Sequence, residues 1–184
     1  DIGIRGQGGT QILATDLDAD RDLDLIILGS TDQHDIWRND RTWRYESLSD
    51  LADLSNSAIK ALTVADVDAN GYNEIYALQK TNGLEVWQSD GSTWYHETVV
   101  MPSQTTRTWD ELAVNDFNGD GRPDLLLSGP SGFDIFDVTG GVMLFSSDIE
   151  TASAIAVTLD TQRGPSVVVA GKTGLHVWHP GPGR

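Results

Sequence analysis

The sequence predicts an all-β protein built from repeated antiparallel sheets of four strands each. Short runs rich in Val, Ile, Leu, Thr and Trp alternate with clusters of Asp, Asn, Gly and Ser, a pattern typical of strands joined by tight turns. An acidic segment recurs along the chain, and an aromatic residue recurs with nearly the same step. Together these observations favour about four copies of one β-unit.

The two recurring markers set the period of the repeat. The acidic segment starts at Asp16, Asp66, Asp116 and, in degraded form, Thr158, at steps of 50, 50 and 42 residues. The aromatic residues are Trp37, Trp87, Phe136 and Trp178, at steps of 50, 49 and 42. Two unrelated markers that keep the same step indicate that whole units repeat. Units of 40 to 50 residues with four strands are typical of β-propeller blades.

Each unit is expected to contain a strand, the acidic loop, a second strand, a third strand with the aromatic residue, and a last strand. Unit one comprises Gln11 to Thr15, Leu23 to Leu28, Asp35 to Arg38 and Thr42 to Ser47. Unit two comprises Ile59 to Ala65, Glu74 to Leu78, Leu84 to Trp87 and Thr93 to Val99. Unit three comprises Glu111 to Asn115, Asp124 to Leu127, Phe133 to Asp137 and Val142 to Phe145. Unit four comprises Ala154 to Leu159, Ser166 to Ala170 and Leu175 to His179.

We therefore expect residues 1–184 to form a single β-propeller or a fragment of one, with blades at about 10–50, 58–100, 110–147 and 153–180. The fourth unit has only three expected strands, and residues 1–5 could supply its outer strand. They could equally belong to a preceding blade, so a complete four-bladed ring and part of a larger propeller both stay open. A second copy of the chain could also complete the propeller.

The acidic loops carry the candidate metal ligands. In three loops, oxygen-bearing side chains fall at positions 1, 3, 5 and 9, counted from the first acid. Calcium takes six to eight oxygen ligands, and alternate side chains around a sharp reversal can wrap one ion. The candidates are Asp16, Asp18, Asp20, Asp22 and Asp24; Asp66, Asp68, Asn70, Tyr72 and Glu74; and Asp116, Asn118, Asp120, Arg122 and Asp124. At position 7, the unlike residues Asp22, Tyr72 and Arg122 suit a backbone carbonyl ligand.

These loops differ from an EF-hand, which closes with a Glu at position 12 and leads into a helix. Here position 12 is apolar and lies in a β-prone run. Asp, Asn and Gly also form ordinary turns. The same spacing of oxygen-bearing residues in three loops nevertheless favours metal binding. Loop one has Arg21 at position 6, where the other two loops have Gly, so a β-carbon is expected in a left-handed conformation at a cost of about 1 kcal/mol. We still expect an ion there. Loop four, with one carboxylate, is expected to hold none.

The repeated pattern resembles the FG-GAP or VCBS repeats of integrin-alpha-like β-propellers, whose D-x-D-x-D-G-x-x-D loops bind calcium. Residues 116–124 fit that motif closely, and residues 66–74 fit it with Glu at the last position. The resemblance implies about three Ca²⁺ ions that stabilise the blades rather than catalyse a reaction.

The net charge and the acidic loops limit the classes of partner and the location that we expect. With 28 acidic and 12 basic residues the formal charge is −16, which argues against nucleic acid as a partner. Three divalent ions would change −16 to −10. No apolar run approaches the length of a membrane span. Calcium sites of this type bind in the range of roughly 0.1 to 1 mM, which favours a secreted, periplasmic or cell-surface location. The start at Asp1 suggests a mature chain or an excised piece.

The expected function is that of an extracellular interaction module that binds a protein. Glycan binding, or a role as accessory domain of a polysaccharide-active enzyme, is the alternative. No nucleophile elbow, zinc motif or phosphate loop occurs, and the free acids Glu85, Glu97, Glu111 and Asp134 show no paired spacing, so we do not expect an enzyme. Trp109 falls outside the repeat register and is the Trp singled out as a candidate for an exposed contact residue.

Overall fold

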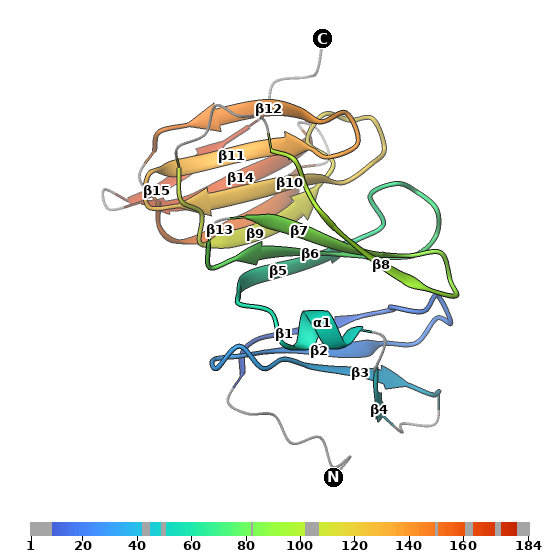
Figure 1. Cartoon of the computed structure of the whole chain (residues 1–184). Helices are drawn as coiled ribbons and strands as arrows, with labels where there is room; N and C mark the ends of the chain where they lie inside the picture. Colours follow the sequence, from blue (N-terminus) through green and yellow to red (C-terminus); the bar gives the residue numbers. More distant parts are fainter. Residues whose placement is uncertain are drawn as a thin grey trace. The chain divides into compact units, whose positions relative to one another are not determined.

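Strands that follow one another in the chain pair into four antiparallel sheets (Figure 1). The computed structural model describes residues 9–41, 45–48, 51–81, 83–101, 107–149, 151–160, 164–171 and 174–179, with the backbone alone for 151–160. Three of the sheets have four strands and the fourth has three among the described residues. The predicted all-β class is confirmed.

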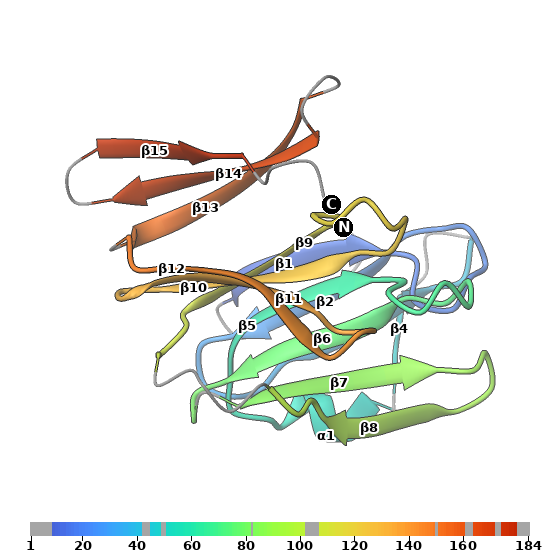
Figure 2. The ribbon, with the colours of Figure 1, turned by 90° about the horizontal axis from the view of Figure 1, so that it is seen from above.

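The first sheet contains β1 (Gly9–Thr15), β2 (Asp24–Gly29), β3 (Asp35–Asn39) and β4 (Tyr45–Ser47). The second contains β5 (Ile59–Ala65), β6 (Glu74–Gln79), β7 (Leu84–Ser89) and β8 (Trp94–Thr98). The third contains β9 (Glu111–Asn115), β10 (Asp124–Gly129), β11 (Gly132–Asp137) and β12 (Val142–Ser147). The fourth contains β13 (Thr151–Asp160), β14 (Gly164–Gly171) and β15 (Gly174–Trp178), which lie side by side in Figure 2.

Every strand predicted within the four units is present, and where the chain is described the ends agree to within three residues. The predicted start of the last strand of unit one, residues 42–44, and the predicted outer strand at residues 1–5 lie outside the described residues. The division into blades therefore stays a prediction.

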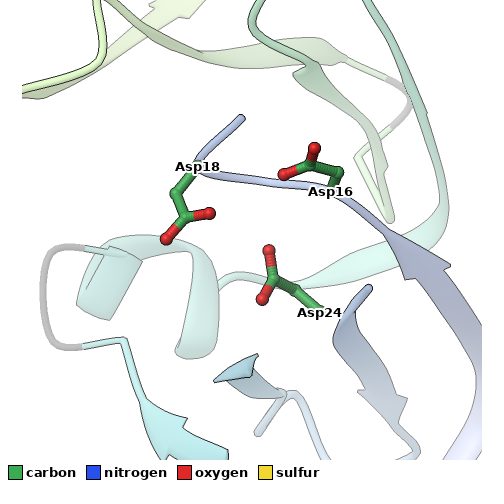
Figure 3. Close-up of side chains that lie close together, drawn as sticks. All are labelled: Asp16, Asp18 and Asp24. Atoms are coloured by element: carbon green, nitrogen blue, oxygen red, sulfur yellow. The ribbon is translucent and has the colours of Figure 1, made fainter. Parts of the chain in front are cut away.

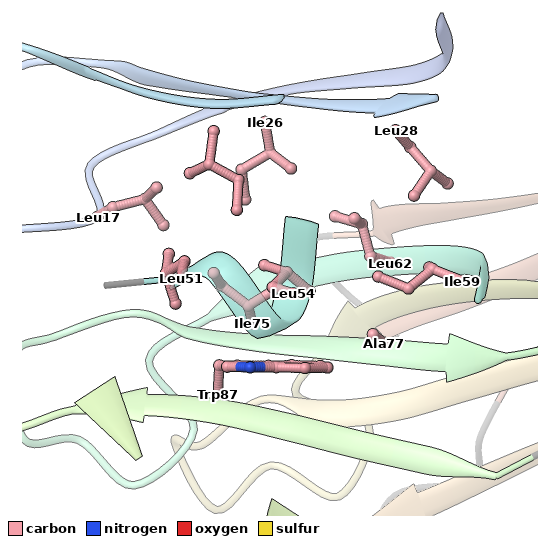
Figure 4. Packing of buried hydrophobic residues seen from close by; sticks show 11 residues of the cluster. Leu17, Ile26, Leu28, Leu51, Leu54, Ile59, Leu62, Ile75, Ala77 and Trp87 are labelled. Atoms are coloured by element: carbon pink, nitrogen blue, oxygen red, sulfur yellow. The ribbon is translucent and has the colours of Figure 1, made fainter. Parts of the chain in front are cut away.

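The structure adds one element that the sequence does not predict, the short helix α1 (Ala52–Ser55). A segment of four residues is too short to display a helical period. Leu51 and Leu54 are fully buried, and Figure 4 shows them between strands of the first and second sheets. The helix therefore fills the space between two sheet faces.

The chain divides into two compact units. The first comprises Asp1–Val64 and Asn70–Thr98 and contains the first two sheets. Its core joins side chains of the first sheet, α1 and the second sheet, and each fully buried aliphatic side chain contributes about 1.5 to 3 kcal/mol (Figure 4). The core residues are Leu17, Ile26, Leu28, Ile36, Leu51, Leu54, Ile59, Leu62, Ile75, Ala77 and Trp87.

The second unit comprises Ala65–Ala69 and Val99–Arg184 and contains the third and fourth sheets. Its core is partly aromatic: the rings of Phe145 and Trp178 lie 4.1 Å apart, and Phe133 meets Trp178 edge-on at 5.9 Å. Phe117, Leu126 and Ile135 pack with Val167 and Val169 in the same core. The repeat aromatic of the fourth sheet thus packs against the third.

Trp109, the candidate for an exposed contact residue, is buried instead. Trp109 is only 2% exposed, and its indole Nε1 donates a hydrogen bond to Asp134 Oδ2 at 2.8 Å. The fully buried Asp134 also accepts from Ser146 Oγ at 2.6 Å and pairs with Arg107 Nη1 at 3.3 Å. A buried Trp usually needs a partner for its N–H, and here a carboxylate supplies it. The residues before β9 are therefore fastened to β11 and β12.

Removal of the Asp134 carboxylate should destabilise the protein, because Arg107 would keep a largely buried charge. We expect Asp134→Ala to lower the free energy of unfolding by about 3 kcal/mol. Asp148→Ala is the matched control, since Asp148 contacts the same guanidinium but its side chain is 93% exposed, and it should cost less than about 1 kcal/mol. Urea unfolding of both variants measures the difference, and equal losses would refute this role for Asp134.

Candidate metal centres

The acidic loops close hairpins between the first and second strands of their sheets. Thr15 pairs with Asp24 across the first hairpin, and Asn115 pairs with Asp124 across the third. Eight loop residues therefore separate the paired ends, and position 9 is the first residue of the second strand. This arrangement brings positions 1 and 9 to the same end of the hairpin.

The loop backbone turns through left-handed residues at positions 4 and 6. Ala19 and Arg21 have φ of 60° and 76°, and Gly119 and Gly121 have φ of 80° and 88°. Loop two has the same conformation, with φ of 61° at Ala69 and 92° at Gly71. The left-handed conformation expected at Arg21 is therefore observed, and a residue with a β-carbon there costs about 1 to 2 kcal/mol.

The carboxylate at position 1 holds this turn by accepting backbone hydrogen bonds. Asp16 accepts from the N–H groups of Asp20 at 3.2 Å and Arg21 at 2.9 Å. Asp116 accepts from Gly119 at 2.6 Å and Gly121 at 2.9 Å. The position 5 side chain supports the next residues in the same way: Asn70 Oδ1, for example, accepts from Tyr72 N at 2.7 Å. The loop is thus organised around its own oxygen ligands.

The carboxylate at position 9 is buried and fixed at the start of the second strand. Asp24 accepts from Leu17 N at 2.7 Å and Asn39 N at 2.8 Å. Asp124 accepts from Phe117 N at 2.8 Å and Asn118 N at 3.2 Å. Burial raises the pKa of both Asp24 and Asp124 to about 6, although the backbone hydrogen bonds oppose the shift. A cation beside these groups would favour their charged form.

Loop one brings three of its predicted ligands together. Figure 3 shows the carboxylates of Asp16, Asp18 and Asp24 facing one another, and one oxygen from each lies within 4.8 Å of the others. Burial, and next the charge of Asp20, raise the pKa of Asp18. The pKa of Asp24 is raised mainly by burial, and the charge of Asp18 adds to that rise.

Loop two gathers the same three positions. Oxygens of Asp66, Asp68 and Glu74 lie within 4.8 Å of one another, and Glu74 is buried. The Glu at position 9 is one methylene longer than the Asp of the other two loops, yet its carboxylate reaches the cluster. Two successive loops thus place carboxylates from positions 1, 3 and 9 in one small volume.

Loop three has an amide in place of the second carboxylate. Asn118 Nδ2 donates to Asp120 Oδ2 at 3.1 Å and to Asp124 Oδ1 at 3.5 Å. The position 3 side chain therefore joins positions 5 and 9 by hydrogen bonds. Its Oδ1 accepts from Asp120 N at 2.8 Å.

The donor sets of loops one and two fit a calcium ion. Calcium binds oxygen at about 2.3 to 2.6 Å, so two ligands on opposite sides of one ion are about 5 Å apart. The 4.8 Å limit within each cluster is compatible with shared coordination of a single ion. All gathered donors are carboxylates, which hard cations prefer.

Some predicted ligands do not join these clusters. Asp20 Oδ2 pairs with Arg41 Nε at 3.1 Å. Both carboxylate oxygens of Asp22 are buried and make no hydrogen bond among the described residues, and this side chain lines a separate cavity with Asn39. The backbone N–H of Arg122 donates to Asp120 Oδ1 at 2.8 Å.

Loop four is only partly described. Of its four equivalent positions, Gln162 lies outside the described residues, and only the backbone of Thr158 and Asp160 is described. Ser166, at position 9, is buried and lies 2.6 Å from His179 Nδ1. The expectation that this loop binds no ion stays a prediction.

Sequence reasoning missed residues that support loop one from outside. Asn73, at position 8 of loop two, donates through Nδ2 to the Asp16 carbonyl at 2.7 Å. Asn39, at the end of β3, fixes Asp24 through its N–H. Only pairing of β2 with β3 and packing within the first unit bring these residues to the loop, and no spacing in the sequence reveals them.

The raised pKa values predict a pH dependence for metal-free protein. Asp24 and Asp124 have a pKa of about 6 when folded and near 3.8 when exposed, so the folded state binds more protons in that window. The free energy of unfolding should therefore fall as pH rises from about 4 to about 6. Asp124→Asn should flatten this fall in the free energy of unfolding, whereas Asp53→Asn, at an exposed position of α1, should not. Urea unfolding of chelator-treated protein tests this, and an unchanged slope in Asp124→Asn would contradict it.

Part of the chain matches the model of a known family. An FG-GAP-like repeat model matches residues 66–127, which span loops two and three. No curated protein matches the chain.

Similar solved structures share the fold at low sequence identity. A lectin of Agrocybe aegerita that recognises non-reducing terminal N-acetylglucosamine has a TM-score of 0.68 and 18% identity, with 98% of this chain and 51% of the lectin covered. BBS1N in complex with ARL6DN has a TM-score of 0.67 and 15% identity, with 98% and 54% covered. A second BBS1N structure gives 0.60 and 15%, with 97% and 55% covered.

The chain spans about half the length of these neighbours, which are β-propeller domains. Among the described residues, no helix is long and apolar enough to cross a membrane. The chain therefore has the fold of β-propeller domains, and its residues 66–127 match an FG-GAP-like repeat.

Proposed function

We propose that the chain is a calcium-stabilised extracellular interaction module whose acidic loops each hold one structural ion. The observation that carries this proposal is the gathering of carboxylates from positions 1, 3 and 9 in two successive loops. A bound Ca²⁺ would supply positive charge at the mutually repelling carboxylates. The residues of each loop would hold it at the end of a hairpin and so fix the first strand to the second.

The assignment to loop three rests on the same backbone. Its left-handed positions and its buried position 9 match those of loop one. A side-chain oxygen is present at positions 1, 3, 5 and 9, although Asn118 replaces a carboxylate at position 3. We propose about three ions per chain, with loop three the weakest of the three sites because it has the fewest carboxylates among positions 1, 3 and 9.

The proposed location follows from the affinity expected of such sites. Extracellular calcium modules bind in the range of roughly 0.1 to 1 mM, far above the calcium level of a cytosol. Sites of this kind fill only outside the cytosol. This consideration supports a secreted, periplasmic or cell-surface protein.

Binding of a protein partner is the proposed activity. Large apolar side chains on two sheets are exposed, among them Ile12, Leu175 and Val177, and exposed apolar patches mark interaction surfaces. A neighbour of the same fold, BBS1N, is found in complex with a protein. The lectin neighbour favours glycan binding as the second candidate.

Calcium should raise the thermal stability of chelator-stripped protein by a measurable amount for each filled site. At a calcium concentration 100 times the dissociation constant of a site, that site adds about 2.7 kcal/mol to the free energy of unfolding. Asp18→Asn should remove the part of this stabilisation that comes from loop one, because Asp18 is the exposed member of its carboxylate cluster. Differential scanning calorimetry with and without calcium measures the shift.

Asp53→Asn is the control for that experiment, since Asp53 lies in the first turn of α1 and outside every acidic loop. This variant should keep the full rise in unfolding temperature that calcium causes. If calcium raised the unfolding temperature equally in the wild type and in Asp18→Asn, loop one would not be a calcium site. No shift in any of the three proteins would remove the proposal of structural calcium.

Titration with N-acetylglucosamine separates the two candidate activities. Glycan binding predicts saturable heat in a calorimeter with the calcium-loaded protein. Protein binding predicts no saturable heat with this sugar.

A further inference from the structure

Loops one and two are joined by the side chain of Asn73. This residue is position 8 of loop two, and its Nδ2 donates to the backbone carbonyl of Asp16, position 1 of loop one, at 2.7 Å. The same nitrogen lies 3.4 Å from Thr15 Oγ1, at the end of β1. A carbonyl can only accept a hydrogen bond, so the amide nitrogen of Asn73 has to face loop one. The contact therefore crosses from one acidic loop to the next.

This contact holds Asp16 from outside its own loop. Within loop one, the Asp16 carboxylate accepts from the backbone of Asp20 and Arg21 and belongs to the carboxylate cluster. On its other side, the Asp16 carbonyl accepts from Asn73. The first predicted ligand of loop one is thus positioned in part by a residue of loop two.

The place of Asn73 in loop two makes its side chain sensitive to an ion there. Tyr72, on one side of it, is expected to supply a backbone carbonyl ligand, and Glu74, on the other side, brings the buried position 9 carboxylate into the cluster of loop two. An ion held by both neighbours would fix the backbone of position 8 between them. The donor that holds Asp16 would then be fixed as well.

The packing of the first unit gives this link a rigid base. Gln11, on β1, exchanges two hydrogen bonds with the backbone of Leu62, on β5: its Nε2 donates to the carbonyl at 3.0 Å, and its Oε1 accepts from the N–H at 3.3 Å. Leu17 and Ile75, which follow Asp16 and Glu74 in the chain, share one hydrophobic core. A movement of Asn73 is therefore transmitted to loop one, because the first strands of the two sheets are fastened to each other.

The other two loops lack this donor. Position 8 is Leu23 in loop one and Pro123 in loop three, and neither side chain carries a hydrogen-bond donor. Loop one nevertheless has the same left-handed turn as loop two. The loop conformation therefore does not require Asn at position 8, and Asn73→Leu gives loop two the residue that loop one already has.

We propose that Asn73 couples the calcium sites of loops one and two, so that an ion in either loop strengthens binding in the other. This inference rests on the proposed calcium sites and concerns their regulation. A single hydrogen bond places the coupling near the lower end of the usual range, at about fivefold in affinity. Coupling between binding sites is reciprocal, so each site gains the same factor from the other. The hairpins of the first two sheets would then be fixed together rather than one at a time.

Calcium titration followed by nitrogen–proton correlation NMR tests the coupling, because it reports each loop separately. The amides at position 6, which are those of Arg21, Gly71 and Gly121, give one dissociation constant for each of the three loops. In chelator-stripped Asn73→Leu protein at physiological salt, the dissociation constant of loop one should rise about fivefold. That of loop three should stay unchanged.

Asn56→Leu is the matched control. Asn56 lies in the same unit and is exposed, and its Nδ2 also donates to a backbone carbonyl, that of Ala52, at 2.8 Å. It lies outside every acidic loop, at the end of α1. All three dissociation constants should therefore be the same in Asn56→Leu as in the wild type.

A comparison of two backgrounds separates the hydrogen bond from electrostatics. Asp68→Asn removes the exposed carboxylate of the loop two cluster. The resulting change of charge acts on loop one in the same way whether or not Asn73 is present. The loss of loop one affinity that Asp68→Asn causes should therefore be about fivefold larger in the wild-type background than in the Asn73→Leu background. Asp18→Asn, with loop two as the reporter, should give the same factor.

Three results would overturn the coupling and leave the calcium sites in place. The first is an unchanged dissociation constant of loop one in Asn73→Leu. The second is an equal loss in Asn73→Leu and Asn56→Leu, which would mean a general loosening of the unit. The third is an equal effect of Asp68→Asn in both backgrounds. If no amide of the wild type responded to calcium, the proposed structural calcium would fail together with the coupling. The dispersion of the amide signals shows in the same spectra whether each variant is folded.

Discussion

A buried carboxylate at the start of the second strand is the constraint around which the acidic loops are arranged. Asp24 and Asp124 are buried, and each holds the backbone of the loop's second residue by a hydrogen bond. This contact fixes the hairpin, but it also removes a charge from water. Burial raises the pKa of both groups to about 6, so the folded metal-free state carries a penalty at neutral pH. A cation bound by the neighbouring loop oxygens would offset that penalty.

The same carboxylate connects the loops to the packing of the sheets. Leu17, whose N–H donates to Asp24, is itself a core residue of the first unit. Phe117 has the equivalent place in the second unit. Position 2 of the loop is therefore held by the carboxylate through its backbone and by the core through its side chain. Loss of order in the loop would loosen the sheet contacts, which is the physical reason for assigning the ions a structural role.

The second general feature is that every sheet has two apolar faces. A propeller blade of this kind is stable only when both faces are covered. β6 and β10 are buried along their whole length, whereas β2 alternates between buried and half-buried residues. The half-buried residues of β2 are Leu25 and Ile27, so the less buried face of this strand is apolar as well.

The sequence predicts the strands and loops well because the period of the repeat is long and two markers share it. The turn at Arg21 is predictable because two equivalent loops have Gly at the same position. Other features depend on contacts between distant residues. α1 has too few residues for a period, and burial of Trp109 depends on Asp134, 25 residues away.

The orientation of the Asp22 side chain toward a cavity, and the reach of Asn73 to the Asp16 carbonyl, depend on which sheets lie side by side. Local pattern carries no information on either. The position 9 carboxylates were predictable as candidate ligands, but their burial and raised pKa follow only from the packed hairpins.

The central claim is that the acidic loops hold calcium, and a direct count of bound ions tests it best. The measurement is equilibrium dialysis of chelator-stripped protein against millimolar calcium, followed by atomic emission analysis of calcium per chain. The account predicts about three ions per chain, with the ion of loop three lost first as calcium is lowered. Absence of bound calcium would contradict the account and reduce the three loops to hydrogen-bonded turns.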